Sequence, residues 1–165
     1  MTAPKPAAAA SLTTVVGTML AMIPMLSLVM WFVLPTDGIG DLPRGWAPIL
    51  IVALAVGAYT FCELVGFRTT PLPPGGQPAD LEKQSWQQFT SSTFVRFAIC
   101  EAVFLVSIAI AFVVSSYWII LIGAVLALPL VAWEAWPGRR TQLRFAAALE
   151  SAGHPSYLLG RPQDY

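Results

Sequence analysis

Residues 102–133 form a run of 32 residues without a single charged side chain. A helix needs about 20 apolar residues to cross a bilayer, so this run is too long for one ordinary span. Ser115 and Ser116, followed by Tyr117 and Trp118, are a polar and aromatic interruption within it. We therefore predict a tight turn at this position, with a membrane-spanning helix on each side.

Two further uncharged stretches, 6–34 and 45–62, precede that run. The first is longer than the apolar region of a signal peptide, which has roughly 7–15 residues, so we expect it to be retained as a span. The second would cover about 27 Å as a helix, nearly the thickness of the hydrocarbon core. The pattern predicts an all-α integral membrane fold with four transmembrane helices arranged as two hairpins. The expected spans are about 11–34, 46–67, 94–114 and 117–136.

The composition agrees with a membrane protein and excludes several other classes. Only 11% of the 165 residues are charged, against about 25% in a soluble domain. The formal net charge is zero and no basic face interleaved with aromatic residues is present, so nothing indicates binding to nucleic acid. Cys62 and Cys100 lie 38 residues apart in apolar segments, which matches neither a CxxC pair nor a secreted disulfide framework.

The basic residues are divided unequally between the two sides that an even number of spans would create. One side would carry Arg44 alone, whereas the side that holds both termini would carry the other eight basic residues. These eight are Lys5, Arg68, Lys83, Arg96, Arg139, Arg140, Arg144 and Arg161. Because basic residues accumulate on the cytoplasmic side, we expect both termini to be cytoplasmic and the chain to be a multi-pass protein of the plasma membrane.

Short segments outside the spans complete the predicted organisation. Residues 1–10 are expected to form an N-terminal tail, and residues 11–136 the four-helix membrane domain. A Pro-rich cytoplasmic loop, 68–88, begins RTTPLPPGG and resembles a polyproline spacer; its later part, LEKQSWQQF, either lies at the interface or lengthens the third helix. Residues 137–165 are expected to form a cytoplasmic juxtamembrane helix, capped by Thr141, and a tail.

The candidate site consists of six charged residues at the inner edge of the bilayer: Glu63, Glu101, Glu134, Arg68, Arg96 and Arg139. The expected spans place none of the glutamates at the midplane, where an ionisable group is most costly and most often functional. One interpretation is a set of ion pairs between helices that fixes their register. The other is a proton-binding carboxylate, which would require a partner protein to cover Glu101.

The dipeptides Cys62-Glu63 and Cys100-Glu101 are expected at the same depth on neighbouring helices. Thiolates and carboxylates are zinc ligands, but adjacent residues on a helix point about 100° apart, so the four side chains do not converge easily. His154 is the single histidine, which excludes a histidine-rich metal site. No metal or cofactor is predicted. No nucleophile–base pair, phosphate-binding glycine loop or redox motif is present, so no catalytic residue and no enzymatic activity are predicted.

The whole-chain layout resembles small four-span actinobacterial membrane proteins of the accessory-subunit type. The resemblance covers roughly residues 10–137 and is carried by the stretches VLPTDGIGDLPRGWAPIL, RTTPLPPGG and FVRFAICEAVFLV. Among such proteins, the chain is similar to the small extra subunit of a mammalian-cell-entry (Mce) lipid importer of mycobacteria. The resemblance implies a non-catalytic accessory or scaffold subunit, bound to permease-type subunits and membrane lipids in a complex that imports fatty acids. The alternative is a proton- or ion-handling membrane subunit that uses Glu101, Glu63 or Glu134.

Overall fold

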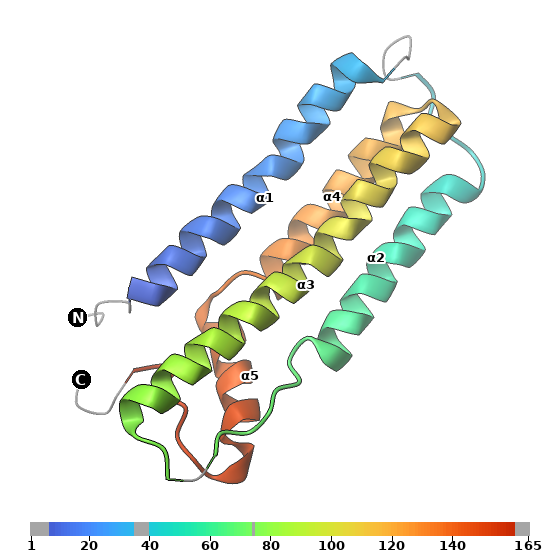
Figure 1. Cartoon of the computed structure of the whole chain (residues 1–165). Helices are drawn as coiled ribbons and strands as arrows, with labels where there is room; N and C mark the ends of the chain where they lie inside the picture. Colours follow the sequence, from blue (N-terminus) through green and yellow to red (C-terminus); the bar gives the residue numbers. More distant parts are fainter. Residues whose placement is uncertain (1–6, 35–39, 74, 161–165) are drawn as a thin grey trace.

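The computed structural model describes residues 7–34, 40–73 and 75–160, so the predicted basic residues Lys5 and Arg161 lie outside the described residues. Within the described ranges the chain is helical and contains no strand. Four of its helices are long and apolar enough to cross a membrane, which confirms the predicted all-α class with four candidate spans (Figure 1). The elements are α1 (Ala7–Val33), α2 (Trp46–Val65), α3 (Pro78–Val114), α4 (Tyr117–Glu134), α5 (Arg139–Leu149) and the 3-10 turn η1 (Glu150–Ala152).

Helices α3 and α4 form the centre of the molecule, where they run side by side in opposite directions (Figure 1). Ser115 adopts the left-handed conformation with φ 47°, which lets the chain reverse over Ser115 and Ser116. Gly123 of α4 faces Ser107 of α3, and a Cβ at this glycine would collide with the serine side chain. The absence of a side chain therefore allows the two helices to approach closely, as small residues do in membrane bundles.

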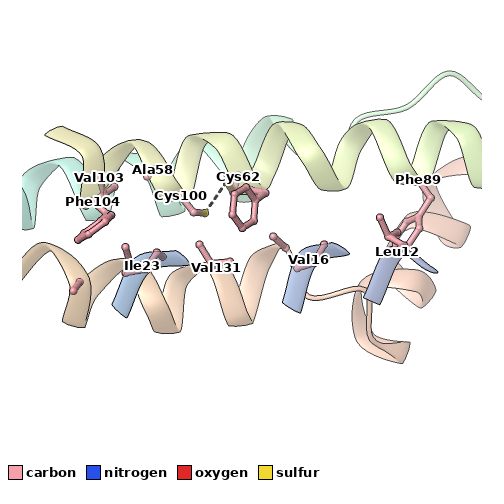
Figure 2. Packing of buried hydrophobic residues seen from close by; sticks show 14 of the residues in the cluster. Leu12, Val16, Ile23, Ala58, Cys62, Phe89, Cys100, Val103, Phe104 and Val131 are labelled. Carbon is pink, nitrogen blue, oxygen red and sulfur yellow. Dashed lines mark hydrogen bonds between the residues drawn. The ribbon is translucent and has the colours of Figure 1, made fainter. Parts of the chain in front are cut away.

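Helices α1 and α2 flank this central pair on opposite sides (Figure 1). In α1, the buried side chains of Leu12, Val16 and Ile23 point toward the central pair (Figure 2). At the far end of α1, the Tyr117 hydroxyl donates a hydrogen bond of 2.7 Å to the Ser27 carbonyl. Because the first two helices lie on opposite faces of α3 and α4, they pack on that central pair more than on each other.

Helix α3 has 37 residues and begins at Pro78, inside the segment predicted as the loop 68–88, rather than near Phe94. Proline is favoured in the first turn of a helix because its missing N–H would be unpaired there in any case. The stretch LEKQSWQQF therefore lengthens the third helix. Phe89 of this extension is fully buried, with its ring centroid 5.5 Å from that of Phe145 in α5.

Helix α5 folds back against this extension at the end of the bundle where α1 begins, an end that we call the base (Figure 1). Phe145 and Leu149 are fully buried there, and the Leu72 amide donates to the Leu149 carbonyl at 3.4 Å. Gly138 is the residue before the helix, so Thr141 is not the cap that we predicted. The helix starts three residues earlier than a cap at Thr141 would give, and the Thr141 hydroxyl instead donates to the Gly138 carbonyl at 2.9 Å.

Candidate functional site

The base of the bundle gathers charged side chains from four helices. We call Glu63, Arg96, Glu134, Arg140 and Arg144 the base cluster. Glu63 and Glu134 lie in the last turns of α2 and α4, Arg96 lies in α3, and both other arginines lie in α5. The cluster forms because the ends of α2 and α4 reach the part of α3 against which α5 packs.

Glu63 is paired through a two-pronged contact with Arg144. The Nη1 and Nη2 groups of Arg144 each donate a hydrogen bond of 2.8 Å to a different oxygen of the Glu63 carboxylate. The Nη2 group of Arg140 lies 3.8 Å from the same carboxylate. The hydrogen bonds to Glu63 raise the pKa of Arg144, so this guanidinium outside the spans stays charged. Sequence reasoning placed Arg68, Arg96 and Arg139 beside the glutamates because of their expected depth, and it left Arg144 out of the candidate site.

Arg96 is fully buried and, among the described residues, does not form the predicted ion pair with a glutamate carboxylate. Its Nη1 group donates a 2.5 Å hydrogen bond to the backbone carbonyl of Glu134, and its Nη2 group donates to Thr93 Oγ1 at 3.3 Å. The guanidinium carbon also lies 4.3 Å from the centre of the Phe67 ring. Since Glu134 is the last residue of α4, the charge of Arg96 faces the negative end of that helix's dipole.

The Glu134 side chain is the least satisfied group of the base cluster. It is fully buried, and neither carboxylate oxygen has a hydrogen-bond partner among the described residues. The charged groups that act on it are Glu63, Arg96, Arg140 and Arg144. Burying an ionised carboxylate without hydrogen-bond donors costs on the order of several kcal/mol of folding free energy. Glu134 is therefore the residue of the cluster whose charge is least compensated by hydrogen bonds.

The three other predicted site residues lie apart from the base cluster. Glu101 is partly buried on α3 and makes no ion pair or hydrogen bond within the described ranges. Cys100 points to α2, so the next residue, Glu101, is turned about 100° away from it. Arg68 and Arg139 are exposed, and neither forms an ion pair with another described residue. The six predicted residues therefore do not converge on one site.

The two cysteines meet between α2 and α3, at the common depth that the sequence indicated. The sulfur atoms of Cys62 and Cys100 are 3.8 Å apart, and both residues are fully buried free thiols (Figure 2). Cys62 Sγ also lies 3.9 Å from the Arg96 carbonyl. In the part of the chain that the structure describes, no group of three or more histidine, cysteine or acidic side chains could hold a metal ion.

The arrangement fits two roles, one structural and one chemical. The Glu63–Arg144 pair and Arg96 fasten helix ends to one another, whereas Glu134 offers a carboxyl group that could take or release a proton. No protein-family model matches the chain, and no curated protein or solved structure matches it. The function is therefore inferred from the residues of this chain.

Proposed function

We propose that this protein is a non-catalytic accessory subunit of a larger membrane complex, spanning the plasma membrane with both termini in the cytoplasm. The observation that supports the proposal is Glu101. This carboxylate lies partly exposed on a spanning helix and has no partner in the described part of the chain. Carboxylates within a bilayer are costly and almost always face other protein groups, so a helix of a partner subunit would supply the missing donor or cation.

The base cluster fits a structural role beside such a contact. Glu63 with Arg144 joins α2 to α5, and Arg96 joins α3 to the end of α4. These contacts would hold the helices in a fixed register while the face that carries Glu101 docks on the partner. We further place the connection between α1 and α2 and that between α3 and α4 on the outer side, as two consecutive membrane hairpins.

For the complex itself we propose an Mce-type importer of lipids such as fatty acids. The support is the layout of residues 10–137, which resembles the small extra subunit of such importers. The test is to purify the tagged protein from its own host in mild detergent and to identify the proteins that accompany it. A permease and an ATPase subunit would support the importer. Respiratory subunits without these two would contradict it, and recovery of the tagged chain alone would contradict the accessory role.

Substitutions at Glu101 test the docking contact directly. Glu101→Ala should reduce recovery of the partner subunits, whereas Glu101→Gln should retain most of it because an amide still forms hydrogen bonds. Val125→Ala on α4 is the matched control, since Val125 is a lipid-exposed spanning residue that no described contact requires. Unchanged recovery with Glu101→Ala would remove the observation on which the accessory role depends.

The buried Glu134 favours a second candidate function, a proton-handling subunit that uses this residue together with Glu63 or Glu101. Glu134 is fully buried without a hydrogen-bond partner in the described structure, and the Glu63 carboxylate acts on it. Infrared difference spectroscopy during a pH jump would detect a buried carboxyl group that changes its protonation. A band that vanishes in Glu134→Gln would support this candidate, together with loss of the pH dependence of the assembled complex. A band that is unchanged in Glu134→Gln would exclude this residue.

A further inference from the structure

Two adjoining hollows follow the seam between α2 and α3. The first, which we call the head pocket, has a volume of about 380 Å³ and lies at the end of α2 that faces the base. The second, which we call the tail groove, has a volume of about 300 Å³ and continues along the seam. Phe61 lines both, and Val95 of the head pocket precedes Ile99 of the tail groove by one helical turn.

The head pocket presents hydrogen-bond donors and a positive charge. Arg68 lines it, is exposed, and its guanidinium makes no ion pair or hydrogen bond with another described residue. Thr70 and Ser91 also line it, and their hydroxyl groups are likewise without a hydrogen-bond partner in the described ranges. No aspartate or glutamate is among the lining residues. This combination of a free guanidinium and free hydroxyls suits an anionic group such as a phosphate.

Other polar side chains give the head pocket a fixed shape. The Ser92 hydroxyl donates a 2.5 Å hydrogen bond to the Gly66 carbonyl, and the Thr69 hydroxyl is hydrogen-bonded to the Gln88 side chain. Through these contacts the segment after α2 is attached to α3. The Leu72 amide donates to a carbonyl at the end of α5, which anchors the far side of the same segment. Hydrogen bonds to α3 and α5 therefore hold the segment that follows α2 beside the pocket.

The tail groove is lined by apolar side chains of both helices, some of them small. Ala53 and Gly57 of α2 and Ala102 of α3 are among the small lining residues, and a Cβ built at Gly57 would have no atom within 4 Å. From Ala53 to Val65, 12 residues on, the two hollows extend about 18 Å at about 1.5 Å per residue. That length is close to half of the roughly 30 Å hydrocarbon core, the depth of one leaflet.

We propose that the seam between α2 and α3 binds one phospholipid with a negatively charged headgroup. Its phosphate would accept hydrogen bonds from Arg68, Thr70 and Ser91, and one acyl chain would lie along the tail groove. The charge of the head pocket, the apolar lining of the groove and the one-leaflet length together select this occupant. With cytoplasmic termini the site faces the inner leaflet, where anionic lipids attract basic residues. The lipid site goes beyond the accessory role, and only its assignment to the inner leaflet rests on the proposed orientation.

Native mass spectrometry of the purified full chain tests the site. Titration with phosphatidylglycerol should give a higher affinity than titration with phosphatidylcholine of the same acyl chains. Arg68→Gln should weaken phosphatidylglycerol binding about tenfold, the loss expected for one charge-assisted contact, and should leave phosphatidylcholine binding unchanged. The matched control is Arg139→Gln, which removes another exposed arginine without an ion pair among the described residues and should retain the affinity.

A second pair of variants tests the tail groove. Gly57→Phe should fill the open space beside this glycine and weaken binding of both lipids, whereas Val125→Phe on the exposed face of α4 should not. Circular dichroism verifies the folding of each variant, and Ala102→Leu replaces Gly57→Phe if the latter does not fold. Equal affinity for the two lipids would overturn the proposal, as would equal losses with Arg68→Gln and Arg139→Gln. Competition by glycerol phosphate as strong as that by the lipid would mean that a free anion, not a lipid, is the ligand.

Discussion

Gly66, the residue directly after α2, decides how closely Arg96 can pass that helix end. A Cβ at this position would lie 2.6 Å from Arg96 Cγ and 2.7 Å from its Cδ, closer than carbon atoms approach each other. Arg96 cannot easily move aside because it is buried and donates to the Glu134 carbonyl at 2.5 Å. We expect Gly66→Ala to lower the free energy of unfolding in mixed micelles by about 1–3 kcal/mol, the usual cost of overpacking.

Gly57 provides the control for this substitution, because it lies in the same helix with no atom within 4 Å of a Cβ. Alanine is favoured over glycine within a helix by up to about 1 kcal/mol. Gly57→Ala should therefore leave the stability unchanged or increase it. Similar destabilisation by both substitutions would show that the loss comes from replacing a glycine of this segment in general, and not from the contact with Arg96.

The pair formed by Glu63 and Arg144 is suited to a double-mutant cycle. Its side chains are 27% and 36% exposed, so water and salt weaken the attraction that the two-pronged geometry provides. We expect a coupling free energy of about 1 kcal/mol between Glu63→Ala and Arg144→Ala, measured by unfolding in micelles. Arg144→Lys should lose most of it, because an ammonium group cannot donate to both carboxylate oxygens in the same way.

The same cycle carried out with Arg139 tests whether the coupling is specific. Arg139 is exposed at the start of α5 and forms no ion pair with a described residue. Glu63→Ala and Arg139→Ala should therefore be additive. A coupling as large as that with Arg144 would indicate a general effect of positive charge at the base, and it would contradict the specific pair.

At the scale of the elements, apolar runs predicted the four spans, because a bilayer demands long uncharged segments. The start of α3 was not predictable in this way, since its first turns are polar and are stabilised by packing on α5. Phe89 becomes part of a helix buried against Phe145, and these two residues are 56 positions apart in the sequence. The partner of Glu63 was missed for a related reason. Depth alone suggested Arg68, whereas the fold-back of α5 brings Arg144 to the carboxylate.

The packing of α2 on α3 can be tested through its two cysteines. Their sulfur atoms, 3.8 Å apart, need to approach only to the disulfide length of about 2.05 Å. Treatment of the purified protein with iodine, which accepts the two electrons while two protons are released, should form a bond between Cys62 and Cys100. Mass spectrometry of proteolytic peptides should detect the linked pair within one chain. Cys100→Ser should prevent the link, and disulfides that form only between chains would contradict the observed packing.

At the scale of the whole molecule, the central pair α3 and α4 is well buried, whereas α1 and α2 expose broad apolar faces. Such faces would be unstable in water, but lipid tails solvate them as well as other side chains do. Membrane insertion is therefore part of what stabilises this fold. The base, where α5 meets the extended α3, is the part built like a soluble protein, with buried aromatic contacts and hydrogen-bonded loops.

The proposed orientation of the molecule, with the base in the cytoplasm, rests on the basic residues at the base. Leu42, in the connection between α1 and α2, and Ser151, in η1 directly after α5, are both exposed. That connection and α5 lie at opposite ends of the bundle (Figure 1). In intact cells, a maleimide that cannot cross the membrane should label Leu42→Cys but label Ser151→Cys only after permeabilisation. The native cysteines are fully buried, so they should not contribute to the signal. The reverse labelling pattern would place the base outside the cell, and the arginines of α5 would then contradict the rule that positive charge stays in the cytoplasm.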